Sequence, residues 1–277
     1  MSIYELSAIT GSVSLVAGFL GSLTGLGGGV VIVPVLTLVF HVDIRYAIGA
    51  SLVSVIATSS GAAAAYVKEG FSNIRIGMFL EMATTMGALF GALIATVVPG
   101  AAVGFIFGLV LIHSAYLSNR PHPAGQNGMP DALAAKLRMD SSYPGPNGPI
   151  PYYVNAVPAG FSLMFVAGTL SGLLGIGSGA VKVLAMDRAM HIPFKVSTTT
   201  SNFMIGVTAA ASAGIYLNRG YIDPMVSMPV MLGVLVGSAV GARILIAVRT
   251  RVLRLVFSLL ILALGVEMIY NAFAGRF

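Results

Sequence analysis

The chain has 277 residues, of which 57% are hydrophobic and only 9% are charged, and its mean hydropathy is +0.93. Soluble domains carry about 25% charged residues, so this composition excludes an ordinary soluble protein and indicates a polytopic helical membrane protein. The net charge of +6 fits cationic loops on one side of a membrane, not nucleic-acid binding. The sequence contains no cysteine, which excludes thiol chemistry and cysteine metal sites.

The first half of the chain, residues 1–117, predicts one interrupted apolar segment followed by three long ones. A glycine cluster interrupts the first segment, and its second piece of about 11 residues is short beside the roughly 20 that a membrane span needs. This half therefore predicts a broken or re-entrant unit and three transmembrane helices, over residues 6–23 with 30–40, 46–67, 74–98 and 101–117.

Residues 118–151 differ in composition and are rich in proline, glycine and polar residues. They predict an extramembrane linker with a short helix at Asp131–Met139. The second half, residues 152–277, then repeats the pattern of the first, and the whole chain predicts 8–10 membrane segments. The second set covers residues 154–174 with a broken piece to 190, then 196–217, 224–247 and 252–273.

The two halves match each other at a fixed offset of 150 residues. Gly25, Gly27 and Gly29 fall on Gly175, Gly177 and Gly179, and the register continues without gaps over roughly 75 residues. Further matches pair His41 with His191, Ser51 with Ser201, Thr58 with Thr208, and Gly87 with Gly237. Such a register indicates an internal duplication, which is a common origin of transporter folds.

The loop charges predict that the two halves are inverted relative to each other. Arg249, Arg251 and Arg254 cluster before the last segment, whereas the matching turn at Pro99 carries no charge. Under the positive-inside rule these equivalent loops face opposite sides of the membrane. Inversion requires an odd number of crossings per half, which three long segments and a unit returning to its own side provide. We therefore expect a cytoplasmic linker and non-cytoplasmic termini.

The glycine clusters are the first candidate for a binding site. Irregular backbone at membrane depth occurs only where it is buried in protein or lines a cavity. The helix that follows each cluster would point free N–H groups at a small anion. The alternative is that these glycines only let helices pack closely. The candidate residues are Gly25, Gly27, Gly28 and Gly29, with Gly175, Gly177, Ser178 and Gly179.

Polar residues close to the second cluster extend this candidate site. Lys182 follows the cluster where the first half has Ile32, and a cation at that depth is costly and functional by default. Lys182 either binds a substrate anion, or snorkels, or pairs with Asp187 or Glu267. The hydroxyls of Ser51 and Ser201 and the amide of Asn202 could replace the hydration of an oxyanion, or serve as helix caps and interhelical hydrogen bonds.

Two acidic residues within apolar segments, Glu81 and Glu267, are candidates for carrying a coupled proton. For Glu81, which lies close to the end of its segment, a solvated structural role is the favoured alternative. His41 and His191 occupy equivalent loop positions and are expected to make loop hydrogen bonds.

An intramembrane enzyme is the rival class of protein. Ser178 lies between glycines, but Ile176 occupies the position that a Gly-x-Ser-Gly serine-protease pattern needs for its first glycine. The sequence also has no His-Glu-x-x-His motif and no paired-aspartate motif. We therefore expect no enzyme, no cofactor and no metal site.

The duplicated Gly-x-Gly-Gly-Gly and Gly-x-Gly-Ser-Gly elements, with Ser51 and Ser201 in the helices after them, resemble the sulfite exporter TauE/SafE family. This family is also called the 4-toluene sulfonate uptake permease family. The likeness covers nearly all of the membrane part, but the proline-rich linker is not typical. It implies a bacterial or archaeal inner-membrane carrier of a small anion such as sulfite, thiosulfate, a sulfonate or sulfoacetate.

Taken with the residues, the resemblance predicts a secondary transporter that works by alternating access with proton coupling. Its partners would be a small anionic substrate and the lipid bilayer, without nucleic acid, and it would be a monomer or a homodimer. The alternative is an anion channel that uses the same central site as a filter.

Overall fold

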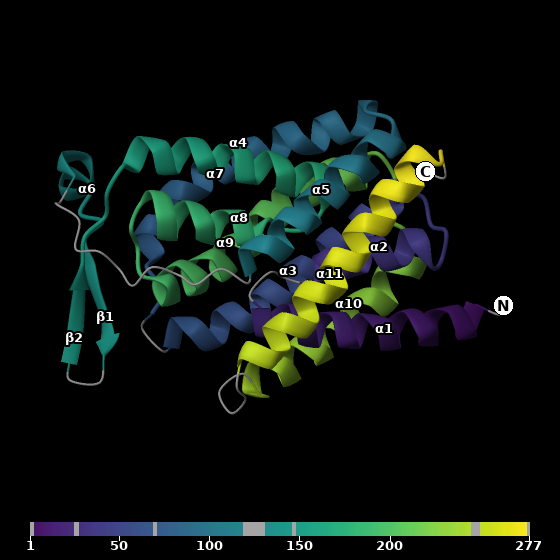
Figure 1. Ribbon diagram of the computed structural model, residues 1–277, viewed down its shortest axis with the longest axis horizontal. Coiled ribbons are helices and arrows are strands. Elements are labelled where there is room, and N and C mark those ends of the chain that lie inside the picture. Colours follow the sequence, from purple (N-terminus) through teal and green to yellow (C-terminus); the bar gives the residue numbers. More distant parts are fainter. Residues whose placement is uncertain are drawn as a thin grey trace.

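The computed structural model describes residues 3–24, 28–68, 71–118, 131–145, 148–244 and 250–275, and Figure 1 shows its arrangement. The first half of the chain forms five helices: α1 (Ile3–Thr24), α2 (Gly29–Leu38), α3 (Ile44–Lys68), α4 (Ile74–Val97) and α5 (Gly100–Ser118). The second half forms α7 (Val157–Leu174), α8 (Gly179–Leu184), the π-helix η1 (Ala185–Ala189), α9 (Phe194–Asn218), α10 (Pro224–Ile244) and α11 (Thr250–Phe273).

This architecture confirms the predicted all-α membrane protein, and the expected segment bounds agree with these helices to within three residues. Among the described residues, three helical stretches are long and apolar enough to cross a membrane by length and composition. They are Ile74–Val97, Val157–Leu174 and Pro224–Gly241. Several shorter apolar helices accompany them, including α2 and parts of α1, α3, α5 and α11.

The internal duplication is visible in where the helices begin. The pairs α2 and α8, α3 and α9, α4 and α10, and α5 and α11 each start 150 residues apart. Local details repeat as well. His41 and His191 both adopt a left-handed backbone, with φ of 52° and 57°. The amide of the next residue then bonds back to the preceding helix, Val42 to Leu36 and Ile192 to Met186, which closes both helix ends in the same way.

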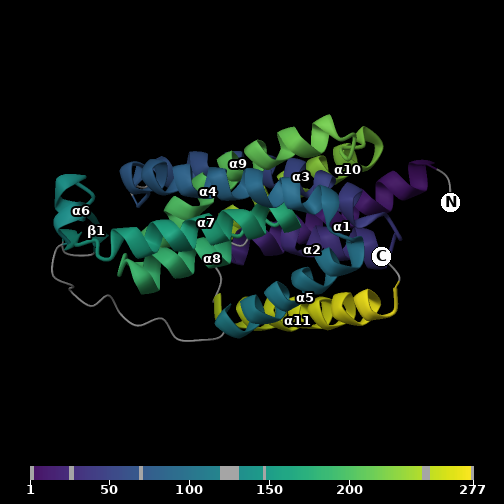
Figure 2. The same cartoon turned by 90° about the horizontal axis from the view of Figure 1, so that it is seen from above.

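The helices form two bundles, each of which borrows one helix from the other half of the sequence. We call α1, α2, α3 and α10 the first bundle, and α4, α7, α8 with η1, and α9 the second bundle. In the first, α10 packs along α1 and α3; in the second, α4 packs along α7 and α9. The two bundles meet where α3 packs against α9. Helices α5 and α11 lie side by side along one edge of the molecule (Figure 2).

Glycines allow the closest helix contacts in both bundles. A Cβ atom added to Gly87 would lie 2.1 Å from the Phe165 oxygen, and one added to Gly168 would lie 2.1 Å from the Thr84 oxygen. In the first bundle, Gly237 and Gly18 approach the backbone of the neighbouring helix in the same manner, at Leu15 and Val234. Close packing, proposed above as the alternative for the clusters, is thus the role of these glycines within the helices.

Two pairs of equivalent helices run in opposite directions through the molecule. The side chain of Arg45, at the start of α3, donates to the Val98 oxygen just after the end of α4 and lies over the Tyr221 ring just before α10. At the other end, Lys195 at the start of α9 lies over the Phe71 ring just before α4. Therefore α3 and α9 run antiparallel, and so do α4 and α10.

The described part of the linker contains the expected short helix, α6 (Ala132–Lys136), and an antiparallel hairpin of β1 (Ser141–Gly145) and β2 (Gly148–Tyr152). The sequence did not predict the hairpin, because its strands contain prolines that cannot donate ladder hydrogen bonds. Asn73 joins the hairpin to the membrane helices by donating to the Tyr152 hydroxyl at 2.7 Å. Burial raises the pKa of Tyr152.

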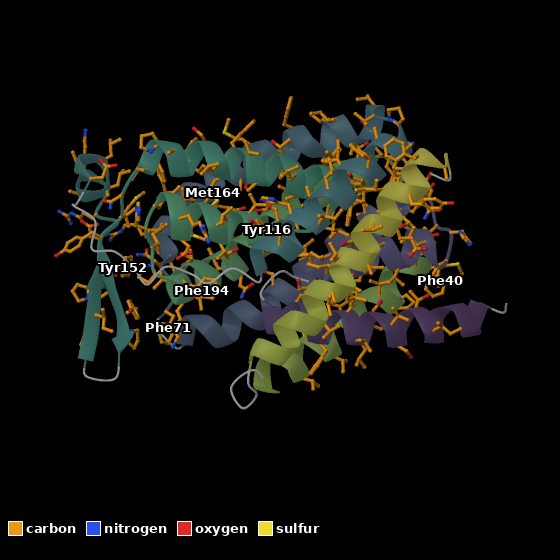
Figure 3. All side chains as sticks on the ribbon, viewed as in Figure 1. Phe40, Phe71, Tyr116, Tyr152, Met164 and Phe194 are labelled. Atoms are coloured by element: carbon orange, nitrogen blue, oxygen red, sulfur yellow. The ribbon has the colours of Figure 1, made fainter. Side chains whose placement is uncertain are left out.

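Figure 3 shows Tyr152 and Phe71 at the hairpin end of the molecule and Phe40 toward the opposite end. Helix α1 begins, and α11 ends, away from the hairpin (Figure 1). The arrangement is compatible with the prediction that the linker and the two termini face opposite sides of the membrane.

Candidate functional site

The second glycine cluster breaks a helix inside the protein, as the sequence predicts. Helix α7 ends at Leu174, and Gly175 and Gly177 both adopt a left-handed backbone with φ of 67°. Ser178 does the same at φ 44°, and α8 begins directly after it. The Ser178 hydroxyl donates to the Ala167 oxygen at 2.6 Å, which ties the break to α7. All of residues 171–179 are buried.

The first cluster contributes the residues next to its own break. Gly25 and Gly27 lie outside the described residues, whereas Gly28 is buried and precedes the first turn of α2. A Cβ atom on Gly29 would lie 2.5 Å from the Ser51 hydroxyl oxygen and 2.9 Å from the Gly175 oxygen. A side chain therefore does not fit at position 29, because Gly175 of the second cluster lies directly against it.

The two halves of the sequence meet at this point. The Ser51 hydroxyl donates to the Gly175 oxygen at 2.7 Å, so a helix of the first bundle satisfies a carbonyl at the break of the second. Its counterpart Ser201 donates to the Gly179 oxygen at a longer 3.4 Å. Gly29, Ser51 and Gly175 thus come together between the bundles, as the candidate site requires.

Asn202 also lies at the contact between the bundles. Its backbone oxygen accepts a hydrogen bond from Ser59 on α3 at 2.7 Å, and its side chain is buried on α9. Gly206, one turn further along α9, would place a Cβ atom 2.5 Å from the same Ser59 hydroxyl. Helices α3 and α9 therefore pack closely here. The hydrogen bond from Ser59 to its backbone oxygen places Asn202 within this contact.

Lys182 is fully buried and belongs to a polar cluster in the second bundle. Its Nζ donates to the Thr208 Oγ1 at 2.5 Å, and the Thr208 hydroxyl donates to Glu81 Oε1 at 2.6 Å. The Lys182 Nζ and Glu81 Oε2 are 3.9 Å apart. The three side chains come from α8, α9 and α4, so both halves of the sequence build the cluster.

This geometry corrects two expectations. The ion-pair partners considered for Lys182 were Asp187 and Glu267, but the structure pairs it with Glu81. The solvated role expected for Glu81 is wrong, because only 7% of the residue is exposed. Glu81 lies about two helical turns into α4, where α7 and α9 cover it. The other acidic candidate, Glu267, is exposed on α11, which packs against α5.

Thr208 is the member of this cluster that sequence reasoning missed. It matches Thr58, so the repeat gave it no distinction. A partial signal was present, because the 150-residue register matches Lys182 with Ile32, Glu81 with Met231 and Glu267 with Leu117, so each of these charges lacks a charged counterpart. An unmatched cation at membrane depth calls for an acidic partner, and the register leaves both Glu81 and Glu267 as candidates.

The chemistry available at this site is that of charge and hydrogen bonding. Within the described ranges, no group of three or more histidine, aspartate or glutamate side chains could hold a metal ion. Instead the cluster provides one ammonium, one carboxylate and one bridging hydroxyl in a buried setting, where electrostatic interactions are stronger than in water. Such a cluster suits recognition of an anion or a proton.

Comparison with known proteins gives one family and a group of relatives. The model of the family described as "Sulfite exporter TauE/SafE" matches residues 11–268. "Probable membrane transporter protein YunE" of Bacillus subtilis (strain 168) is 28% identical over 267 residues, covering 93% of this chain and 95% of its own. "Probable membrane transporter protein MJ0441" of Methanocaldococcus jannaschii is 26% identical over 272 residues, covering 93% of both chains. No solved structure matches.

Proposed function

Because the chain belongs to the sulfite exporter TauE/SafE family, a family of membrane transporters, we propose that it is a secondary carrier of a small anion. The substrate class is a sulfur oxyanion: sulfite, thiosulfate, a sulfonate or sulfoacetate. The chain is a multi-pass membrane protein whose relatives are named as membrane transporters and not as enzymes. We place it in the inner membrane of its cell.

The observation that carries this proposal is the fully buried Lys182, three residues after a helix break. An ammonium at membrane depth is expensive even beside Glu81, and a positive charge there favours a negative ligand. Helix breaks next to the site leave backbone groups that can replace part of the water around an anion. Ser51 and Ser201 hold the backbone at the break in place, since their hydroxyls donate to the Gly175 and Gly179 oxygens.

Two bundles of opposite orientation support transport by alternating access. Each bundle contains three elements from one half and one helix from the other, so the bundles are candidates for rigid bodies that rock about the α3–α9 contact. In inverted-repeat carriers, substrate sites lie near the bilayer midplane where the repeats meet. We propose this inverted arrangement for the two halves of the chain.

Proton coupling is the remaining element of the proposal, and Glu81 is the better of the two candidate residues. It is buried beside Lys182, whereas Glu267 is exposed on a different pair of helices. A carboxylate in contact with the substrate-binding cation can sense whether the substrate is present.

A flux experiment separates a carrier from the alternative, an anion channel. The purified protein is reconstituted in liposomes, and uptake of sulfite, thiosulfate, sulfoacetate, taurine and simple carboxylates is measured with and without a proton gradient. A carrier accumulates one of the sulfur anions above its external concentration when protons flow inward. Flux that only dissipates anion gradients would identify a channel, and flux of none of the sulfur anions would reject the proposed substrate class.

A further inference from the structure

We propose that Glu81 is an internal counter-anion that the substrate replaces on Lys182, so that each transported anion enters the site together with one proton. The inference rests on the proposed anion transport and gives it a coupling mechanism. It is argued from the burial of both charges, the distinct surroundings of the two Glu81 oxygens, and the fact that Glu81 is the charged group found to act on Lys182 among the described residues.

Burial makes the two charges depend on each other. Lys182 is fully buried and Glu81 is 7% exposed, so neither ion can turn to water for compensation. Removing either charge leaves the other in a setting where an isolated ion is strongly disfavoured. A substrate anion that reached Lys182 while Glu81 stayed ionised would place two negative charges beside one positive charge.

The two oxygens of Glu81 differ in a way that suits proton uptake. Oε1 accepts hydrogen bonds from Thr208 at 2.6 Å and from Thr85 at 3.2 Å. Oε2 is buried without a hydrogen-bond partner, and the Lys182 Nζ at 3.9 Å is beyond hydrogen-bonding distance. A proton can therefore bind Oε2 without breaking the Thr208 bond that holds the carboxyl group in place. The neutral carboxyl group no longer balances the charge of the Lys182 ammonium, which can then bind the substrate anion.

On the described elements around Glu81, Lys182 is the charged group that is paired with it. Helix α7 has no charged residue, and the charges of α4 and α9 near the hairpin, Arg75 and Lys195, contact the Arg138 oxygen and the Phe71 ring. Asp187 and Arg188 lie on η1, beyond the end of α8. The charged group that acts on Lys182 is Glu81.

The sign of the pH dependence follows from this exchange. If the empty site holds ionised Glu81 and the loaded site holds its protonated form, binding one anion takes up one proton. Linkage then makes the anion bind about tenfold tighter for each unit by which the pH falls. The dependence disappears below the pH at which Glu81 is already protonated in the empty protein. Proton and anion move in the same direction.

The test measures binding of thiosulfate and methanesulfonate, whose charges stay constant from about pH 5 to 9, by calorimetry in detergent. In the wild type, affinity for the probe that binds should rise about tenfold for each unit by which the pH falls, over the range in which the empty site holds ionised Glu81. Glu81→Gln should bind with no pH dependence, and at pH 8 it should bind more tightly than the wild type. The matched control Glu267→Gln, on exposed α11, should keep the wild-type slope.

Infrared spectroscopy of the protein without and with thiosulfate reports directly whether the Glu81 carboxyl group is protonated. At pH 8 the wild type should show no protonated-carboxyl band that Glu81→Gln removes, and thiosulfate should make that band appear. A wild type that transports sulfur anions while Glu81→Gln retains the pH slope overturns the coupling inference alone. Failure of every variant to bind or transport these anions overturns the proposed function with it, and a protonated Glu81 in the empty protein at pH 8 overturns the ion pair.

Discussion

The two bundles use equivalent helices and the same glycine contacts, but they differ in what lies at one helix crossing. In the second bundle Lys182, Glu81 and Thr208 form a buried charged cluster. At the equivalent positions the first bundle has Ile32, Met231 and Thr58. There the Thr58 hydroxyl donates to the Ser54 oxygen, within its own helix.

This difference indicates that the ion pair is not needed to build the crossing. Apolar side chains occupy the equivalent positions in the first bundle, and a buried ion pair often contributes no more to stability than apolar residues of similar volume. Burying charged groups costs free energy, and of the two equivalent sites only the one in the second bundle contains them. We attribute this difference to function. The duplication thus supplies a symmetric frame, and we propose that the transport chemistry occupies one of its two equivalent places.

The largest effect is expected for membrane topology, and it tests whether the two halves of the chain are inverted. Gly100 begins α5 and Thr250 begins its equivalent α11. Because the chain has no cysteine, single substitutions Gly100→Cys and Thr250→Cys can be labelled in cells with a membrane-impermeant thiol reagent. Inverted halves place the two positions on opposite sides, with Thr250→Cys on the same side as Gly125→Cys in the linker. Labelling of positions 100 and 250 from one side would reject the inverted repeat.

The next largest effect is expected from changing the charged crossing into its apolar counterpart. Lys182→Ile alone strands the buried carboxylate of Glu81 and should destabilise the protein by about 3–5 kcal/mol. The double variant Lys182→Ile/Glu81→Met copies the first bundle and should recover stability to within about 1 kcal/mol of the wild type. Both variants should lose anion transport.

Thermal unfolding in detergent and flux in liposomes measure these two properties on the same preparations. The double variant is expected to insert and unfold normally while it lacks the site, so it serves as the control for folding. A double variant as unstable as the single one would show that the ion pair is a structural requirement of the second bundle, contrary to the comparison with Ile32 and Met231.

A smaller loss of stability, similar in the two bundles, is expected from substitutions at the glycine contacts. Gly87→Ala and Gly237→Ala would place a methyl group within 2.1 Å and 2.0 Å of the Phe165 and Leu15 oxygens. Each should cost about 1–3 kcal/mol, because overpacking forces the helices apart. Gly214→Ala, with open space around its Cβ, should instead gain up to about 1 kcal/mol from helix propensity. Unequal losses at Gly87 and Gly237 would mean that the bundles are not equivalent.

The sequence predicted the helices well because apolar length and the 150-residue register are local properties of the chain. It also placed the break at Gly175–Gly179 and the buried Lys182. It could not predict that α4 and α10 exchange between bundles, since that depends on which helices pack together in three dimensions. Glu81 lies 101 positions before Lys182 in the sequence, so nothing in its local sequence linked the two residues. A solvated role was expected instead from its position near the end of its own segment. The hairpin was missed because Pro144, Pro149 and Pro151 argue against strands.

The smallest effect expected concerns the threonines that the repeat treats as equivalent. Thr208→Val removes a hydroxyl that accepts from Lys182 and donates to Glu81. Hydrogen bonds to charged groups contribute about 1.5–3 kcal/mol, and Thr85 still donates to Glu81 Oε1, so we expect a net loss of about 1–2 kcal/mol. Thr58→Val removes a bond to the Ser54 oxygen within one helix, which should change stability by less than about 0.5 kcal/mol.

Thr208→Ser should restore most of the loss, because it retains the hydroxyl, and thermal unfolding of all three variants measures the difference. The comparison becomes decisive in the Lys182→Ile/Glu81→Met background. There the charges are gone, and Thr208→Val should cost no more than Thr58→Val does in the wild type. A loss that persists without the charges would assign Thr208 to helix packing, and the polar cluster would then consist of Lys182 and Glu81 alone.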